Sequence, residues 1–296
     1  MTDFEIATVV YSQELNLIRL QAQSFARYLD LNHVKKVWVI ANDPENECCI
    51  AQLRSIYFEQ FGFDPSLVEI VPREAIISTP HGANGYFTQQ LLKMQICNFV
   101  SPTYFVVFDA KNFLIGPAST DYFFNNGKPK CTLSTYEGFQ KSIKDRYCDL
   151  FRLGPERRNQ PSLSMMTPFV FYTNLVKASI ELYQDVTGKS IADLILLELS
   201  NFYHVSEFLL YDVALSAMNR RIEELYFPIA QLSLTLWEGN YPSEEGLSAA
   251  FAVADASAVP VLGLHRKRLL EMSDEEWEVL NKLLSKRGLG PLLKIS

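Results

Sequence analysis

Short apolar runs alternate with helix-period patterns along the first half of the chain. The runs are rich in β-branched and aromatic residues, which is typical of strands buried on both faces. They are residues 6–11, 36–41, 68–71 and 104–108. Apolar residues three or four positions apart predict amphipathic helices between them, over residues 14–29, 45–61 and 85–100. This order predicts an α/β fold with a mostly parallel sheet flanked by helices on both faces.

The second half of the chain has a more helical pattern. Helices are predicted over residues 174–186, 190–199, 206–217 and 274–287, and strands over 130–134 and 167–172. Residues 152–161 (RLGPERRNQP) are rich in proline, glycine and charge, which predicts a surface loop.

Capping residues support several of these boundaries. Ser12 stands where the N-cap of the first helix is expected, and Gly62 closes the second helix. Ser273 and Glu276 have the spacing of a capping box at the start of the last helix.

Composition narrows the functional class. The 296 residues are 48% hydrophobic and 21% charged, which is ordinary for a globular protein. The net charge of −7 argues against a nucleic-acid binder, because there is no basic excess to neutralise phosphates. The five cysteines form no C-x-x-C pair and show no zinc spacing, which fits a reducing cytoplasm. We expect a cytoplasmic protein, since we find neither a signal peptide nor an apolar run long enough to form a transmembrane segment.

The strand at residues 104–108 stops abruptly on the carboxylate of Asp109. A charge is costly to bury, so Asp109 should lie where the strand leaves the core. Ligands bind at the carboxyl ends of strands in open α/β sheets, which makes Asp109 the first candidate site residue. The alternative is that Asp109 only caps the following turn.

The helix before this strand carries a polar stripe. Tyr86, Gln90, Lys93 and Cys97 share one side of it. Gln90 and Lys93 beside a strand-end carboxylate could bind a phosphorylated ligand, with Lys93 as a point charge. The alternative is an ordinary solvated helix face.

Several familiar motifs are missing. Residues 187–190 (TGKS) resemble the end of a phosphate loop, but position 183 is Tyr183 instead of glycine and a helix precedes it. No G-x-G-x-x-G follows the first strand, and no G-x-S-x-G is present. These absences argue against an oxidoreductase, a P-loop ATPase and an esterase.

The order of several short motifs resembles a largely uncharacterised family of bacterial proteins related to nucleotide-sugar glycosyltransferases of the GT-A fold. The motifs are VVYS-x-E at residues 9–14, GYFTQQLLK at 85–93, FDAKN at 108–112, SEFLLY at 206–211 and GLHR at 263–266. The resemblance extends over about residues 5–287. It implies one GT-A-like domain over residues 1–296, with a nucleotide-sugar-binding half (1–125) and an acceptor half with C-terminal helices (126–296).

The resemblance implies a set of donor-binding residues. In GT-A enzymes a D-x-D motif holds Mn²⁺ or Mg²⁺ on the diphosphate. Asp109 would be its first acid, but Lys111 replaces the second, with Asn112 next to it. Lys111 could instead place its ammonium near the diphosphate and partly replace the metal. Tyr11 and Asn42 would line the base and ribose, while Gln90 and Lys93 lie beside the diphosphate.

His265 follows the apolar run 259–264, at a second predicted strand end. By the same resemblance it would contact the cation or the diphosphate, so Asp109 and His265 are the candidate metal ligands. The alternative is a hydrogen-bonded structural histidine.

Two carboxylates are candidates for the base that removes the acceptor proton. Glu207 stands at the start of the helix over 206–217, and Asp212 is the second candidate. The alternative for Glu207 is that it only favours the positive end of that helix.

The resemblance therefore implies a glycosyltransferase. It would move a sugar from a nucleotide sugar to a glycan or another hydroxyl acceptor, with polysaccharide biosynthesis as the expected setting. Two alternatives remain open at this point. One is a degenerate GT-A domain that binds nucleotide sugar or glycan without turnover. The other is a different nucleotide-dependent transferase or a phosphohydrolase that uses Asp109.

Overall fold

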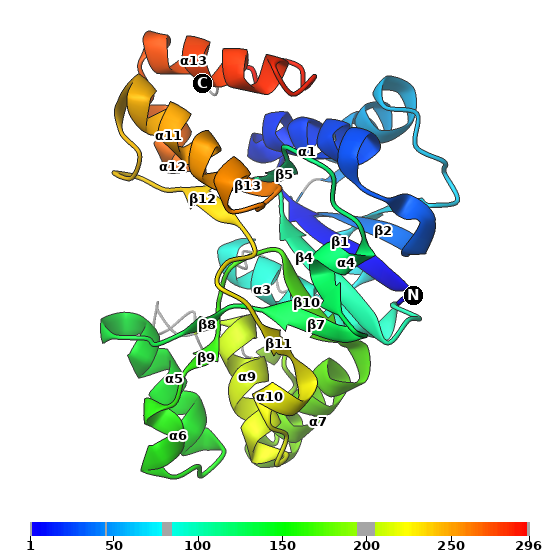
Figure 1. Cartoon of the computed structure of the whole chain (residues 1–296). Coiled ribbons are helices and arrows are strands. Elements are labelled where there is room, and N and C mark those ends of the chain that lie inside the picture. The colour runs from blue at the N-terminus through cyan, green and yellow to red at the C-terminus, as the bar shows by residue number, and fades with distance from the viewer. Residues whose placement is uncertain (1, 45, 79–84, 194–204, 295–296) are drawn as a thin grey trace.

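A five-stranded sheet forms the centre of the molecule (Figure 1). The computed structural model describes residues 2–44, 46–78, 85–193 and 205–294. The strand order is β10-β4-β1-β2-β3, in which the first four strands of the chain are parallel and β10 runs antiparallel to β4. These strands are β1 (Phe4–Val10), β2 (Val34–Ala41), β3 (Val68–Pro72), β4 (Tyr104–Asp109) and β10 (Phe169–Tyr172). The predicted α/β class with a mostly parallel sheet is confirmed.

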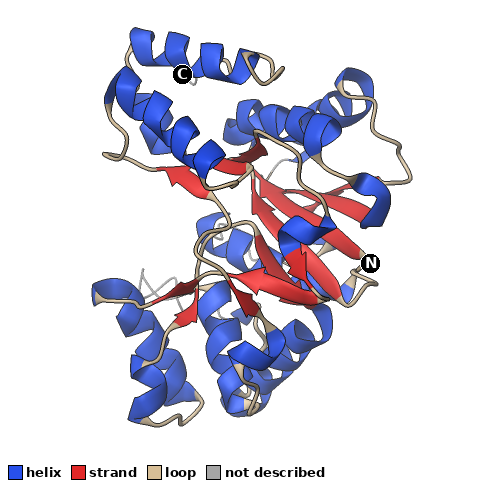
Figure 2. Ribbon diagram, viewed as in Figure 1, coloured by secondary structure: helices blue, strands red, loops and turns tan. Residues whose placement is uncertain are grey.

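Helices cover both faces of this sheet (Figure 2). Successive side chains of a strand point to opposite faces, so Phe105 and Val107 of β4 pack into one core cluster and Val106 and Phe108 into another. The first cluster includes α3 (Gly85–Gln95), α7 (Thr173–Thr187) and α9 (Glu207–Ala217). The second includes α1 (Leu15–Tyr28) and α2 (Asn46–Arg54). A strand with apolar residues at every position is therefore buried on both sides.

A small sheet continues from the end of β4. Its order is β12-β13-β5, formed by β5 (Asn112–Leu114), β12 (Leu234–Leu236) and β13 (Val261–Leu264). A third core cluster joins this sheet to α11 (Ser243–Ala256), α12 (Arg266–Glu271) and α13 (Asp274–Ser285). Leu17 and Leu20 of α1 belong to the same cluster, so the last helices pack beside the first one (Figure 1).

The remaining elements are short helical turns, two-to-four-residue strands and helices that connect these layers. The turns and helices are η1 (Ser12–Glu14), η2 (Leu31–His33), the π-helix η3 (Ser55–Gln60), η4 (Arg73–Ala75), η5 (Ile96–Asn98), α4 (Thr120–Phe123), α5 (Gly138–Leu150), α6 (Pro155–Asn159) and α10 (Ile222–Leu225). The strands are β6 (Phe124–Asn125), β7 (Lys128–Cys131), β8 (Leu133–Ser134), β9 (Ser162–Leu163) and β11 (Phe227–Pro228).

The surface loop predicted over residues 152–161 is correct in part, because the segment is mostly exposed but is not a loop throughout. It contains α6, which begins at Pro155, because proline fixes the first helical φ and lacks only an N–H that would have no partner there. Arg157 of this helix is buried and forms an ion pair with Asp212 of α9. One of the charges that indicated a solvated loop is therefore used inside the protein.

The predicted cap at Ser12 is also wrong. Ser12 begins the 3₁₀ turn η1, and α1 starts after it at Leu15. The backbone N–H and the hydroxyl of Ser12 donate to the two carboxylate oxygens of Asp43, at 2.7 and 2.9 Å. Ser12 therefore connects the segments that follow β1 and β2.

Other boundaries agree in part. The capping box of Ser273 and Glu276 is confirmed, and Gly62 has the predicted left-handed conformation with φ of 66°. The helix predicted over 85–100 ends at Gln95, and the strand predicted over 130–134 is divided into β7 and β8. The helix predicted over 190–199 lies largely outside the described residues.

Two further findings concern the cysteines and membrane crossing. All five cysteines are free. Within the described ranges, no helix combines the length and the apolar character that crossing a membrane requires.

Candidate functional site

The carboxyl ends of three neighbouring parallel strands lie together, and this row of strand ends forms one edge of the central sheet. Val9 of β1 lies opposite Asp109 of β4, and Val10 lies opposite Ala41 of β2. Asp109, Tyr11 and Asn42 therefore stand side by side, at the ends of β4, β1 and β2. This edge is where open α/β sheets bind ligands.

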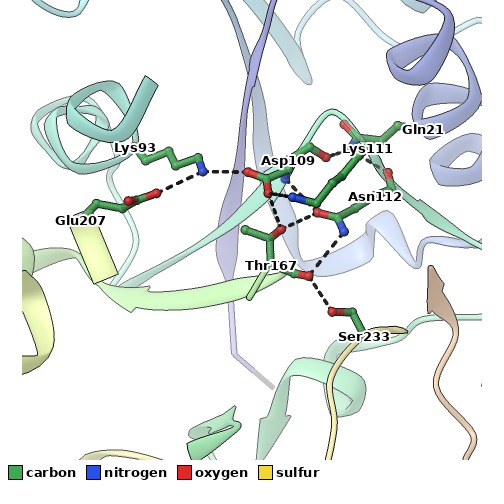
Figure 3. Close-up of polar contacts among 8 residues, drawn as sticks. All are labelled: Gln21, Lys93, Asp109, Lys111, Asn112, Thr167, Glu207 and Ser233. Carbon is green, nitrogen blue, oxygen red and sulfur yellow. Dashed lines mark hydrogen bonds and ion pairs between the residues drawn. The ribbon is translucent and has the colours of Figure 1, made fainter. Parts of the chain in front are cut away.

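The carboxylate of Asp109 is held between two ammonium groups (Figure 3). Lys93 Nζ of α3 lies 2.7 Å from Asp109 Oδ1, and Lys111 Nζ lies 2.5 Å from Asp109 Oδ2. Burial opposes the charge on Asp109, but Lys111 and Lys93 outweigh it and hold the pKa of this carboxyl far below its usual range. Asp109 is therefore ionised at neutral pH.

Lys93 also contacts a second carboxylate. Its Nζ donates to Oε1 of Glu207, the first residue of α9, at 3.1 Å. The side chains of Lys93 and Glu207 are only 6% and 4% exposed. Burial alone would lower the pKa of Lys93, but the charges of Asp109 and Glu207 raise it above its ordinary value. One ammonium thus connects α3, β4 and α9.

The turn between Asp109 and Asn112 is held in a fixed conformation from both sides. Asn112 Oδ1 accepts the backbone N–H of Asp109 at 2.9 Å, and Gln21 Nε2 of α1 donates to the carbonyls of both residues at 2.8 Å. Thr167 Oγ1 lies 2.9 Å from Asp109 Oδ2 and 2.6 Å from Asn112 Oδ1. Ser233 Oγ donates to the carbonyl of Thr167 at 2.7 Å (Figure 3). These bonds keep the carboxylate and the Lys111 backbone in one arrangement.

The small sheet brings an aromatic group to this turn. The N–H of Leu264 donates to the carbonyl of Lys111, and the N–H of the next residue, His265, donates to the carbonyl of Leu236. Trp237, which follows β12, packs against the His265 ring in a tilted arrangement, with centroids 4.5 Å apart. Lys111 Nζ lies 5.1 Å from the centroid of the same indole. Lys111 is therefore placed between Asp109 and Trp237.

Arg266 of α12 contacts the turn that follows the first strand. Its Nη1 donates to Oε1 of Gln13 in η1 at 2.6 Å. Glu14, in the same turn, accepts the backbone N–H of Tyr11 at 3.3 Å. Burial, followed by the nearby charge of Asp109, raises the pKa of Glu14 to about 7. The turn after β1 and the start of α12 thus flank the Asp109 turn.

Several buried polar atoms around this edge have no hydrogen-bond partner among the described residues. Tyr11 Oη and His265 Nδ1 can donate or accept, Arg266 Nε can only donate, and Asn42 Oδ1 and Gln90 Oε1 can only accept. Buried polar groups in folded proteins are almost always paired. A set of unpaired atoms at one edge of a sheet is what a polar ligand would complete.

Most of the predicted site residues gather here. Asp109, Lys111 and Asn112 form the turn, Lys93 and Gln90 approach from α3, and Tyr11, Asn42 and His265 lie at strand ends. The polar stripe of α3 is not a solvated face, because Gln90 and Lys93 are only 5% and 4% exposed.

The two predicted bases occupy different surroundings. Glu207 belongs to the cluster through Lys93. Asp212 is fully buried, forms an ion pair with Arg157 and accepts the N–H of Leu163 at 3.1 Å. The structure does not bring Asp212 to the Asp109 turn, and its contacts are those of a structural residue.

Sequence reasoning missed Gln21, Thr167, Ser233 and Trp237. Gln21 lies within a helix, and the others lie 55 or more positions beyond Asn112, so no local pattern connects them to the turn. The one available signal was the position of Trp237 at the end of an apolar stretch, before a polar segment.

The donor set does not fit a divalent cation. Both oxygens of Asp109 are bonded to ammonium groups, and Asn112 Oδ1 already accepts from within the turn. Mg²⁺ and Mn²⁺ need several free oxygen ligands at one point. Across the described ranges, no three His, Cys, Asp or Glu side chains come together in a way that would hold a metal ion.

Comparison with protein families assigns the chain to a family. The model of a family of unknown function, DUF6492, matches residues 5–238, and the chain belongs to that family. No curated protein matches the chain.

Solved structures give distant similarities. The chain is 16% identical to the glycosyltransferase GlyE of Streptococcus pneumoniae TIGR4, with a TM-score of 0.46; the match covers 99% of this chain and 66% of GlyE, just under two thirds of its length. It is 8% identical to the galactosyltransferase LgtC with donor and acceptor sugar analogs (TM-score 0.45, covering 96% and 95%). It is 7% identical to core-mannan synthase A of Aspergillus fumigatus in its Mn/GDP form (TM-score 0.47, covering 77% and 73%). Similarity at this level assigns neither substrate nor metal to this chain.

Proposed function

We propose that this protein is a glycosyltransferase that moves a sugar from a nucleotide-sugar donor to a hydroxyl acceptor. One observation carries the proposal. Two lysines and a set of unpaired buried polar atoms converge where β1, β2 and β4 end. A ligand that forms hydrogen bonds with these unpaired atoms would be polar along its length and negatively charged near Lys111.

The unpaired atoms divide into two groups that match the two ends of a nucleotide sugar. Asn42 Oδ1 and Gln90 Oε1 only accept hydrogen bonds, which suits the N–H and O–H groups of a base and ribose. Arg266 Nε can only donate and Tyr11 Oη can donate, which suits phosphate oxygens. In this proposal Tyr11 and Gln90 therefore exchange the roles that the family resemblance implied for them. Trp237 is 42% exposed beside them and offers an apolar face to a ring.

The chemistry follows from this placement. The bond between the anomeric carbon and the diphosphate oxygen breaks, and its electron pair stays on the diphosphate. A new bond forms to the acceptor oxygen, whose proton passes to a carboxylate. Positive charge fixed near the leaving diphosphate stabilises the transition state. Of the two predicted bases we assign this role to Glu207, because Lys93 connects it to Asp109, whereas Asp212 pairs with Arg157.

The test is binding followed by turnover. The full chain is screened by thermal shift against UDP, GDP, CMP and dTDP sugars, because a ligand of the native state raises its stability in proportion to the logarithm of its concentration over Kd. The donor that binds is then assayed for release of its nucleotide with and without glycan acceptors.

Asp109→Asn is the test variant and Asp121→Asn, at an exposed position of α4, is its matched control. We expect Asp109→Asn to lower turnover on the order of 10²-fold, because Lys111 and Lys93 lose the charge that positions them. The control should keep wild-type turnover. Full activity in Asp109→Asn would refute the site assignment. Binding without turnover would instead indicate a degenerate GT-A domain. Release of inorganic phosphate from the nucleotide would indicate a phosphohydrolase.

A further inference from the structure

The acid that a metal site would need at position 111 is a lysine, and this lysine is held in a specific place. Lys111 Nζ contacts Asp109 Oδ2 at 2.5 Å and lies 5.1 Å from the centroid of the Trp237 ring. Its side chain is 18% exposed, compared with 6% for Lys93. Lys93 is therefore enclosed by carboxylates, while Lys111 is the ammonium that a ligand can reach.

A second cation, Arg266, follows His265 and begins α12. Arg266 donates through Nη1 to Gln13, which leaves its buried Nε–H without a partner in the described chain. His265, one residue earlier, has an unpaired Nδ1. A histidine ring has at least one N–H donor in either protonation state, so it can donate to a phosphate oxygen.

Charge balance indicates what these groups can hold. The ammonium groups of Lys93 and Lys111 are matched by the carboxylates of Asp109 and Glu207. Arg266 adds a positive charge that forms no ion pair with a carboxylate of the described residues, and Glu14, whose pKa is raised to about 7, offsets this charge only in part at neutral pH. An anion fits this surplus, whereas a divalent cation would meet three positive groups.

We propose that Lys111 and Arg266, assisted by His265, bind the diphosphate of the donor directly, so that donor binding needs no divalent cation. This inference rests on the proposed function. When the donor binds, Lys111 moves its ammonium from Asp109 to a phosphate oxygen, and Trp237 continues to contact its stem. The Asp109 carboxylate keeps Lys93 and Thr167 as partners.

The test is isothermal titration calorimetry of the full chain with UDP, GDP, CDP, ADP and dTDP, in EDTA and in MnCl₂. We expect one diphosphate to bind with Kd values within threefold of each other in the two buffers. Lys111→Met and Arg266→Met should each weaken binding in EDTA at least tenfold. Lys141→Met removes an equivalent charge on α5, far along the chain, and should leave Kd unchanged.

Lys111→Asp is the reciprocal variant, since it supplies a second carboxylate two positions after Asp109. It should lose binding in EDTA and recover it in MnCl₂, which also shows that the site remains folded. Wild-type binding that is tenfold tighter with Mn²⁺, or unchanged binding of Lys111→Met or Lys111→Asp in EDTA, would overturn the inference and leave the proposed function standing. Absence of binding by every diphosphate in both buffers would overturn both.

Discussion

Replacing Lys93 with methionine tests whether its ammonium holds the candidate site together. The substitution keeps the length of the side chain and removes its charge. Asp109 would retain Lys111 and Thr167, but no other Lys, Arg or His among the described residues forms an ion pair with Glu207. Glu207, at 4% side-chain exposure, would become a buried carboxylate without a counter-ion.

The expected magnitude follows from this difference between the two carboxylates. Breaking a buried pair by removing one partner costs about 3–5 kcal/mol. Only one of the two carboxylates loses its cation, so we expect a loss of about 3 kcal/mol in the free energy of unfolding. With a urea m-value of about 3 kcal/mol/M, the unfolding midpoint should fall by roughly 1 M.

Urea unfolding followed by circular dichroism measures this loss. Adding Glu207→Gln to Lys93→Met should restore more than about 1 kcal/mol, since an amide needs no counter-ion. Lys141→Met, on a partly exposed i,i+4 pair, should change stability by less than about 1 kcal/mol. A loss of less than about 1 kcal/mol for Lys93→Met would refute the reasoning.

Two further predictions concern the turn after β1. Glu14 has a pKa raised to about 7, so its folded form binds a proton more tightly than its unfolded form, and stability should fall as pH rises from about 4.5 to 7. Urea unfolding at pH 5 and pH 8 should show this loss for wild type relative to Glu14→Gln; a pH-independent difference contradicts it. In Gly85→Ala the new Cβ would lie 2.6 Å from Tyr11 Cε1, so the ring must move and the Kd for the nucleotide should rise at least fivefold. Gly116→Ala, whose Cβ would meet only Pro260 at 3.9 Å, is the control, and equal binding by the two variants would contradict the prediction.

The sequence predicts the strand ends well because burial and charge are local properties. Asp109 ends an apolar run and His265 follows one, so each had to lie where a strand leaves the core. Tyr11 and Asn42 follow from the same pattern, because each lies at the end of a predicted strand. The register of the parallel strands then places them beside Asp109.

The partners of these residues could not be predicted in the same way. Helical periodicity placed Lys93 on a polar stripe but did not distinguish solvent from two buried carboxylates. Asp212 follows Glu207 by five positions, which at 100° per residue turns it about 140° around α9, away from Lys93. Thr167 and Trp237 reach the Asp109 turn only through tertiary packing. Their side chains are ordinary in their own segments.

The family match ends at residue 238, but the packing does not. β5 pairs with β13, and Tyr28 Oη and Gln23 Oε1 of α1 bond the backbone of Arg287 and Gly290. A chain cut after residue 238 would leave one edge of β5 unpaired and an apolar face of α1 in water. It would also lack His265 and Arg266. The segment that the family model matches is therefore shorter than the segment that folds. Protein for any assay should extend at least through Leu292, whose side chain belongs to the third core cluster.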